Sequence, residues 1–283
     1  YCGAFGHNFT FDEMKWLTRW LIVRGCNMLV PHAFYYSVRG PRIDERPPDV
    51  GPNSSWWSEY KPFAEASSRL CWLNTDSRHV CSLAILGLND YLPWEAAKVC
   101  FQNQRDFNYL EARHLWEDAR VGSDGIHIAG MHYKALIVEF GEHAVPRRPG
   151  PASAAVPSAA KDLLPAKAKE ALDALEHAGR LIRWDKADGD TSLLGKINKI
   201  VPAEVEVLPA TPDVRLRHIV KEGTNYYILF NEGQQHIELK LKTSVEGQRF
   251  LLDPETGGQS EIAPDAAIKM QPHELKVLRI VGS

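Results

Sequence analysis

The chain has 283 residues, of which 44% are hydrophobic and 24% charged, with a formal net charge of -3 at pH 7. This is the composition of an ordinary globular protein, and the length allows one large domain or two to three small ones. The slightly acidic balance gives no electrostatic reason to expect a nucleic-acid partner. No apolar run approaches the roughly 20 residues that a membrane-spanning helix needs, so we expect no membrane partner either.

The cysteines exclude two further classes of protein. Cys2, Cys26, Cys71, Cys81 and Cys100 are odd in number and scattered along the chain. This pattern favours reduced thiols and the cytoplasm over a disulfide framework. No two cysteines have the Cys-x-x-Cys spacing of a zinc site, and no glycine-rich phosphate-binding motif is present. We therefore predict no metal and no cofactor from the residues alone.

The N-terminal segment carries a clear helix signal. Thr10 and Glu13 have the spacing of a capping box. Apolar residues recur at helical spacing as far as Leu21, and Gly25 suits the position just after a helix end. Because the chain starts with Tyr1 rather than Met and opens within a well-patterned unit, we interpret it as a fragment of a longer protein.

A buried strand is expected directly after this helix, over the short apolar run 26–30. A second helix is predicted over 58–73. A capped helix followed by a short turn and a buried strand is the repeating unit of an α/β fold. We therefore interpret residues 1–77 as the C-terminal portion of a (β/α)8 barrel.

The next segment, residues 78–211, has the pattern of a separate module. Residues 80–86 and 133–140 read as buried strands, and residues 94–109 as a helix that follows Pro93. This alternation predicts an open α/β module of the flavodoxin-like type with parallel strands.

The end of this module contains the clearest change in composition. Residues 145–165 are mostly Ala, Pro, Ser and Arg without apolar periodicity, which predicts a flexible surface insertion. An Ala- and Leu-rich helix over 165–180 and a strand over 181–184 should follow.

The C-terminal residues 212–283 change to a period of two. Residues 214–219 alternate, and similar short runs follow with glycine-containing turns between them, such as residues 253–257. Short alternating strands at regular spacing predict an antiparallel β-sandwich.

The segment that follows the predicted strand at 26–30 is rich in aromatic and charged side chains. In α/β barrels the loops after the carboxyl ends of the strands build the active site. Aromatic rings stack on the apolar face of a sugar, and charged groups bind its hydroxyls. The predicted carbohydrate-binding residues are His32, Phe34, Tyr35, Tyr36, Arg39, Arg46, Trp56 and Trp57. In the alternative interpretation, the two tryptophans cap a hydrophobic interface and the charges pair with one another.

Hydrolysis of a glycosidic bond usually needs two carboxylates. The acids of the predicted rim are Asp44, Glu45 and Asp49, of which we select Glu45 and Asp49 as catalytic candidates. The two members of such a pair normally come from different strand ends. We therefore expect at least one catalytic acid upstream of Tyr1.

Several segments resemble large bacterial multidomain glycoside hydrolases of the α-L-rhamnosidase type. They are residues 3–6 (GAFG), 13–16 (EMKW), 24–27 (RGCN), 30–37 (VPHAFYYS), 45–53 (ERPPDVGPN), 56–57 (WW), 216–218 (LRH), 227–233 (YILFNEG) and 252–257 (LDPETG). The resemblance implies a (β/α)8 barrel with accessory α/β and β-sandwich modules, of which this chain is the C-terminal part. It also implies inverting hydrolysis by two glutamates and, in some members, a bound calcium ion.

From these features we expect a fragment of a glycoside hydrolase that cleaves α-L-rhamnosides or related sugars. Its partners would be the carbohydrate substrate and the upstream domains of the same parent chain. The alternative is a non-catalytic carbohydrate-binding or scaffolding protein. A free-standing α/β regulatory domain joined to a β-sandwich is a third interpretation.

Overall fold

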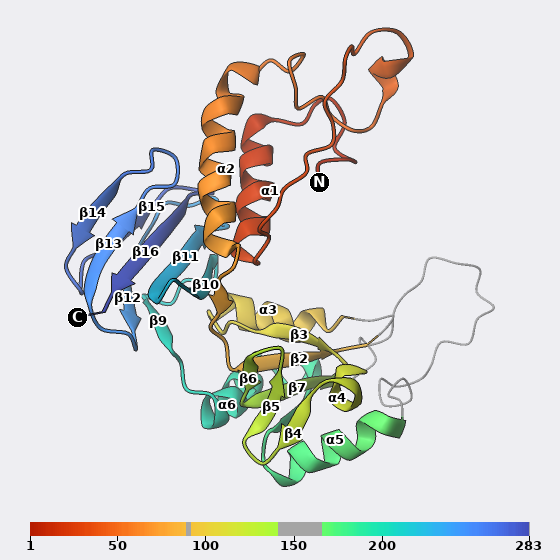
Figure 1. Cartoon of the computed structure of the whole chain (residues 1–283), viewed down its shortest axis with the longest axis vertical. Coiled ribbons are helices and arrows are strands. Elements are labelled where there is room, and N and C mark those ends of the chain that lie inside the picture. The colour runs from red at the N-terminus through yellow and green to blue at the C-terminus, as the bar shows by residue number, and fades with distance from the viewer. Residues whose placement is uncertain (89–91, 141–165, 283) are drawn as a thin grey trace. The chain divides into compact units, whose positions relative to one another are not determined.

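The computed structural model of the chain describes residues 1–88, 92–140 and 166–282 (Figure 1). The insertion predicted at 145–165 lies outside these residues. The backbone divides into two compact units, and each is described by itself.

The first unit combines residues 1–79 with residues 207–283, and the second comprises residues 80–206. This division differs from the three segments expected from the sequence, which were 1–77, 78–211 and 212–283. The N-terminal helices belong with the larger C-terminal sheet because they share one hydrophobic core with it.

Two helices dominate the N-terminal part of the first unit. Helix α1 (Phe11–Val23) begins with the predicted capping box, in which the Glu13 backbone N–H donates to the Thr10 hydroxyl at 3.2 Å. Helix α2 (Tyr60–Asn74) confirms the second predicted helix. Two short 3-10 helices, η1 (Gly40–Asp44) and η2 (Trp57–Glu59), lie between α1 and α2.

The strand predicted at residues 26–30 is wrong, and the described residues form no closed barrel. At the end of this run, the Tyr1 terminal ammonium donates to the Val30 carbonyl at 2.9 Å. Met28 and Val30 are 77% and 70% exposed. An apolar run becomes a barrel strand only where neighbouring strands take up its backbone hydrogen bonds, and the described residues offer none here.

The C-terminal part of the first unit forms two sheets, as predicted for an antiparallel sandwich. The larger has the order β1-β10-β11-β16-β13-β14 and is antiparallel throughout, and the smaller has the order β15-β12-β9. The strands are β1 (Arg78–His79), β9 (Val205–Leu208), β10 (Val214–Lys221), β11 (Thr224–Asn231), β12 (Ile237–Thr243), β13 (Gln248–Leu252), β14 (Gln259–Ile262), β15 (Ile268–Met270) and β16 (Leu275–Val281).

The larger sheet is covered on both faces. Ile228 and Phe230 of β11 pack in one cluster with residues of α1 and α2, such as Ile22. Successive side chains of a strand point to opposite faces, so Leu229, which is fully buried, faces the other way. On that side the Arg249 guanidinium donates to the Leu241 carbonyl of β12 at 3.0 Å, which joins the two sheets.

The second unit contains a four-stranded parallel sheet with the order β3-β2-β7-β8. Its strands are β2 (Leu83–Gly87), β3 (Asn108–Glu111), β7 (Ala135–Phe140) and β8 (Leu181–Asp185). Numbered along the module this order is 2-1-3-4, the beginning of the flavodoxin-like order. The predicted open α/β module with parallel strands is therefore confirmed.

Helices cover both faces of this sheet. Leu83 and Ile85 pack with residues of α3 (Trp94–Gln102) and α6 (Asp190–Ile200). Ala84 and Leu86 belong to a second cluster, on the opposite face, with residues of α4 and α5. Helix α4 spans His114–Glu117, and α5 spans Ala166–His177.

The helix predicted over 94–109 is too long. Helix α3 ends at Gln102, and the Asn103 side-chain amide donates to the Val99 carbonyl at 2.8 Å. Gln104 then adopts a φ of +48°, which stops the helix, and strand β3 begins at Asn108.

A small antiparallel sheet of β4 (Arg120–Gly122), β5 (Gly125–Ile128) and β6 (Met131–Tyr133) completes the second unit. This sheet was not predicted from the sequence. None of the helices in the described residues combines the length and apolar character needed to cross a bilayer.

Candidate functional site

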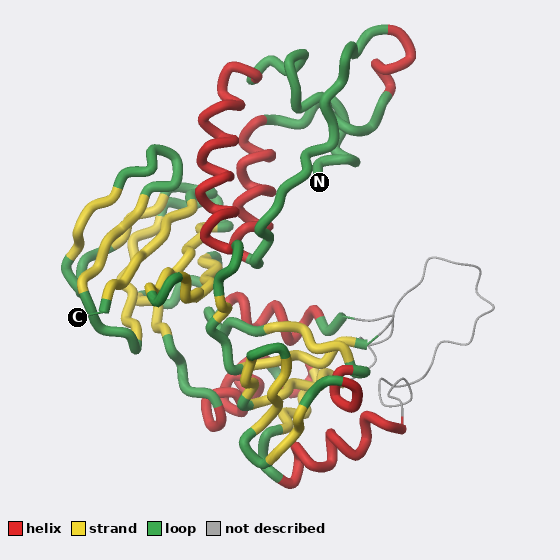
Figure 2. Tube along the Cα trace, viewed as in Figure 1, coloured by secondary structure: helices red, strands yellow, loops and turns green. Residues whose placement is uncertain are grey.

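The predicted carbohydrate-binding residues lie on one long loop between α1 and α2, interrupted by η1 (Figure 2). Backbone hydrogen bonds close this loop on itself. The Ala33 N–H donates to the Pro48 carbonyl at 3.0 Å, and the Val50 N–H donates to the Ala33 carbonyl at 2.9 Å. The N-terminal segment is tied to the loop, because the Gly6 N–H donates to the Arg46 carbonyl. Backbone hydrogen bonds therefore join the two sides of the loop to each other and to the N-terminal segment.

Asp49 is the central hydrogen-bond acceptor of the loop. Its carboxylate accepts from the backbone N–H of Gly51 at 2.7 Å and of Tyr35 at 3.4 Å. It also accepts from the backbone and the side-chain amide of Asn53, at 3.2 and 2.5 Å. Asp49 is buried, and four donors occupy the lone pairs that a proton-transfer or nucleophilic role would require. This geometry favours a role in shaping the loop.

Phe34, Trp57 and Tyr60 form an aromatic platform. The Trp57 and Tyr60 rings stack with centroids 5.0 Å apart, and Phe34 meets both edge-on at 6.1 and 5.6 Å. Phe34 is 50% exposed and Trp57 39% exposed, so two of the three rings present area to solvent. The platform depends on Gly51, where an added Cβ would lie 2.7 Å from the Phe34 ring.

The two predicted tryptophans have different surroundings. Trp56 stacks on Phe11 of α1 with ring centroids 5.2 Å apart, and it packs against the buried cluster that contains Met14 and Phe63. This agrees with the alternative interpretation for Trp56 alone. Trp57 belongs to the exposed platform. The side chains of these two adjacent tryptophans therefore lie in different places, Trp56 against the core and Trp57 at the surface.

Tyr35 and Tyr36 also diverge. The Tyr35 hydroxyl donates to the Pro47 carbonyl at 3.1 Å, and the Arg42 guanidinium lies 5.9 Å from its ring. Loss of hydration, with a further contribution from the Glu45 carboxylate, raises the pKa of Tyr35 above its ordinary value. Tyr36 is fully exposed and free to contact a ligand.

The remaining predicted residues lie on the surface of the loop. His32, Arg39, Glu45 and Arg46 are all exposed. Glu45 follows η1, whereas Asp49 lies inside the loop. The structure therefore places the two acid candidates in different environments, one solvated and one fully engaged.

Tyr60 is the platform residue that the sequence analysis missed. Tyr60 lies near the start of the helix predicted over 58–73. An aromatic residue at that position is normally interpreted as part of the face that the helix buries, so Tyr60 was not predicted to bind a ligand. The available signal was its spacing from Trp57, since residues three apart lie on one face of a helical turn. Burial raises the pKa of the Tyr60 hydroxyl.

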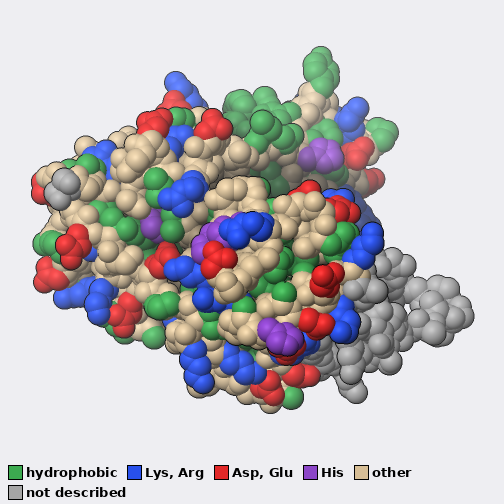
Figure 3. Space-filling model, turned by 60° about the horizontal axis from the view of Figure 1, so that its bottom comes forward, with side chains coloured by type: hydrophobic (Ala, Val, Ile, Leu, Met, Phe, Trp, Pro, Cys, Tyr) green, Lys and Arg blue, Asp and Glu red, His purple; other side chains and the backbone are tan. Residues whose placement is uncertain are grey.

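Acidic and basic side chains are interspersed on the face of the molecule shown in Figure 3. This mixture agrees with the small net charge of the chain. It provides no electrostatic argument for a polyanionic partner on that face.

No protein-family model matches the sequence, and no curated protein matches it. Solved structures do match the fold. The chain is similar to a rhamnosidase from Novosphingobium sp. PP1Y, with a TM-score of 0.64 and 14% identity over 99% of this chain and 30% of that one.

Two other glycoside hydrolases are similar over most of this chain. An exo-carrageenase of family GH42 from Bacteroides ovatus gives a TM-score of 0.54 and 12% identity, over 97% of this chain and 39% of the enzyme. A β-galactosidase from Bacillus circulans sp. alkalophilus gives 0.55 and 8%, over 95% and 52%. At these identities the similarity shows the fold, which is glycoside-hydrolase-like. The chain spans about a third to a half of the length of these enzymes.

Proposed function

We propose that the chain is the C-terminal portion of a glycoside hydrolase that acts on α-L-rhamnosides or related deoxy sugars. In this proposal the loop between α1 and α2 forms one wall of the sugar-binding site. The observation that carries it is the aromatic platform of Phe34, Trp57 and Tyr60, in which Phe34 and Trp57 are exposed. Tyr36, on the same loop, is also exposed. The fold similarity to glycoside hydrolases supports it.

The physical basis is the match between these side chains and a deoxy sugar. A pyranose presents an apolar C–H face, which an aromatic ring covers, and a methyl group in place of a hydroxyl increases the apolar area. Arg39 and Arg46 are exposed on the same loop and can donate to hydroxyl groups. In this proposal, other parts of the enzyme would supply at least one of the two carboxylates that cleave the glycosidic bond.

The test is the binding of rhamnose and aryl rhamnosides to the chain, measured by titration calorimetry or by ligand-observed NMR. Trp57→Ala should weaken binding roughly three- to tenfold, the value of one aromatic stacking contact. Trp72→Ala is the matched control, because Trp72 is an exposed tryptophan of α2 outside the platform. Equal losses in the two variants, or no saturable binding to any sugar of a broad panel, would contradict the proposal.

A second candidate function is carbohydrate binding without hydrolysis. The observation that favours it is that the Asp49 carboxylate already accepts four hydrogen bonds within the loop. Of the two predicted catalytic acids, only Glu45 is exposed. Inverting glycosidases need two carboxyl groups about 6.5–9.5 Å apart. Assay of the full-length parent on aryl glycosides separates the candidates, since binding without turnover supports this second function and turnover excludes it.

A further inference from the structure

The small sheet of the second unit brings two histidines together. A two-residue turn joins β5 to β6, and its residues Ala129 and Gly130 have φ values of +49° and +77°. Two successive positive φ values define the type I′ turn, which fixes the register of a hairpin. In this register His127 and His132 are directly opposite each other on adjacent strands. Their rings stack with centroids 4.1 Å apart and an angle of 10° between the planes.

Asp124 adds a carboxylate to this pair from the turn between β4 and β5. Its Oδ2 lies 2.8 Å from Nε2 of His127 and 3.7 Å from Nε2 of His132. The turn lies close against β6, because a Cβ on Gly125 would lie 2.1 Å from the Tyr133 carbonyl oxygen.

These three side chains have the chemistry of a metal site. In the part of the chain that the structure describes, they form the one group in which three such ligand atoms lie within 4.8 Å of one another. Ligands of a tetrahedral zinc ion, at about 2.1 Å from the metal, lie roughly 3.4 Å apart. The two distances from the Asp124 carboxylate lie on either side of that value.

We propose that Asp124, His127 and His132 together bind a divalent transition-metal ion, with Zn²⁺ as the preferred occupant. Two imidazole nitrogens and one carboxylate oxygen form a ligand set that suits zinc. In this site Nε2 of each neutral imidazole would give its lone pair to the metal, and the single ring proton would lie on Nδ1. A proton that Nε2 carries in the metal-free form would move to Nδ1 through solvent, so no net proton is released. One or more coordination positions remain for water.

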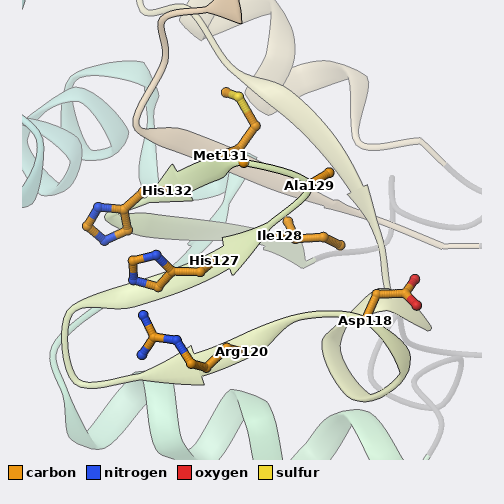
Figure 4. A pocket seen from close by; sticks show the side chains of 8 residues that line it. Asp118, Arg120, His127, Ile128, Ala129, Met131 and His132 are labelled. Atoms are coloured by element: carbon orange, nitrogen blue, oxygen red, sulfur yellow. The ribbon is translucent and has the colours of Figure 1, made fainter.

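Figure 4 shows the two imidazoles side by side on neighbouring strands, with Arg120 on the third strand beside His127. Both rings line a pocket of about 350 Å³, so they are accessible to a solvated ion. Arg120 is paired in register with His127, and its positive charge opposes a cation nearby. The site should therefore bind metal less tightly than its three ligands alone would allow.

The competing explanation is a hydrogen-bond network without metal. In that network His127 bonds to the Asp124 carboxylate, and Nε2 of His132 bonds to the Asp124 carbonyl oxygen at 3.0 Å. This network would stabilise the two turns and leave the protein indifferent to zinc. The two explanations make different predictions: only the metal site requires that one equivalent of metal binds, and that it binds through the side chains of Asp124, His127 and His132.

The experiment uses the whole chain, purified without a histidine tag and freed of metal by chelation. Titration calorimetry with Zn²⁺ should show one equivalent bound. His127→Gln and His132→Gln should each weaken binding at least about tenfold, since even residues that only orient a metal ligand cost about 10- to 100-fold. The matched control is His114→Gln, which removes a histidine paired with one carboxylate, Asp118, and should leave the affinity unchanged. Arg120→Gln should tighten binding roughly two- to fivefold, because it removes a nearby like charge.

Two spectroscopic measurements on the unsubstituted chain do not depend on the folding of variants. Zn²⁺ should shift the ring-nitrogen NMR signals of two of the eleven histidines. Bound Co²⁺ should give visible bands of a nitrogen- and oxygen-ligated site without thiolate charge-transfer bands. The proposal is overturned by the absence of one-equivalent binding, by thiolate ligation, or by equal affinities of the His132→Gln and His114→Gln proteins.

Discussion

At the residue scale, one carboxylate organises the candidate sugar-binding loop. Asp49 receives hydrogen bonds from the backbone at Tyr35, Gly51 and Asn53, which are up to 18 residues apart in the chain. This acceptor therefore bonds the backbone on both sides of the Phe34 contact, since Tyr35 follows Phe34 in the chain and Gly51 lies against the Phe34 ring. The sequence predicted that Asp49 is a catalytic acid. The residue type and its place in a loop do not show whether a carboxylate contacts a substrate or accepts hydrogen bonds from the backbone.

The first prediction concerns this acceptor. Asp49→Asn should lower the free energy of unfolding by about 1 to 3 kcal/mol, because an amide N–H₂ would face groups that are themselves donors. Urea unfolding followed by tryptophan fluorescence measures the change. Asp44→Asn, on the exposed surface of η1, is the control and should change stability by no more than about 0.5 kcal/mol. Equal stabilities of the Asp49→Asn protein and the unsubstituted chain would refute the role assigned to Asp49.

The second prediction concerns a buried thiol of α3. Burial raises the pKa of Cys100 from 9.0 to about 12. Because its pKa is raised in the folded state, the contribution of this thiol to stability is complete below pH 9. It is lost as the pH rises from about 9 toward 12, where only the unfolded chain releases the proton. The loss should be about 1.4 kcal/mol per pH unit.

The measurement compares the unsubstituted chain with Cys100→Ala between pH 8.5 and 10.5. The difference in unfolding free energy between the two proteins should change by roughly 2 kcal/mol in favour of the variant. Val99→Ala removes a buried, non-ionisable side chain from the same helix, so its effect should not depend on pH. Parallel pH profiles for Cys100→Ala and the unsubstituted chain would contradict this prediction.

At the scale of elements, local signals determined helix α1 well. The capping box of Thr10 and Glu13 satisfies backbone donors that a helix start leaves free, so it acts within four residues. The prediction of a strand at 26–30 is wrong because strand formation is not a local property. A strand has no hydrogen bonds of its own, and its formation depends on neighbours that local sequence does not specify.

The third prediction tests the cap. Thr10→Ala should destabilise the first unit by about 1 kcal/mol, because it removes the acceptor for the Glu13 N–H. Thermal unfolding by circular dichroism measures the shift. Thr10→Ser keeps the hydroxyl and serves as the matched control, so it should restore most of the lost stability. If alanine and serine behave alike, the cap does not hold the start of α1.

At the scale of the whole molecule, two separate sets of core residues organise the chain. The N-terminal helices and the larger C-terminal sheet share one cluster, although residues 80–206 lie between them in the sequence. The residues between them bury their own side chains on both faces of a parallel sheet. Each unit should therefore respond to loss of its own core residues.

The fourth prediction compares one core substitution in each unit. Ile228→Ala and Ile197→Ala should each cost about 2 to 5 kcal/mol, because both leave a cavity in a packed core. In hydrogen exchange, Ile228→Ala should reduce protection in α1 and α2 as well as in β10 and β11. Ile197→Ala should reduce protection in β2, β7 and α6. A loss confined to the sheet in the Ile228→Ala protein would show that the helices are stabilised independently of it.

The sequence by itself determined those features that depend on neighbours along the chain. These are the capped helix α1, helix α2, the parallel module with its alternating buried positions, and the period-two strands of the C-terminal sheets. It also drew attention to the aromatic loop through its density of aromatic and charged residues, although the strand predicted before that loop is wrong. Physical reasons for these successes are local: helix caps, side-chain periodicity and turn residues act over a few residues.

Only the tertiary structure decided which side chains meet. It joined Phe34 and Trp57 to Tyr60, and it separated Trp56 into the core. It placed His127 opposite His132 through a type I′ turn whose first residue, alanine, rarely adopts a positive φ and so gives little sequence signal. Contacts between strands and loops depend on register and packing, and these are set by the whole fold rather than by any one segment.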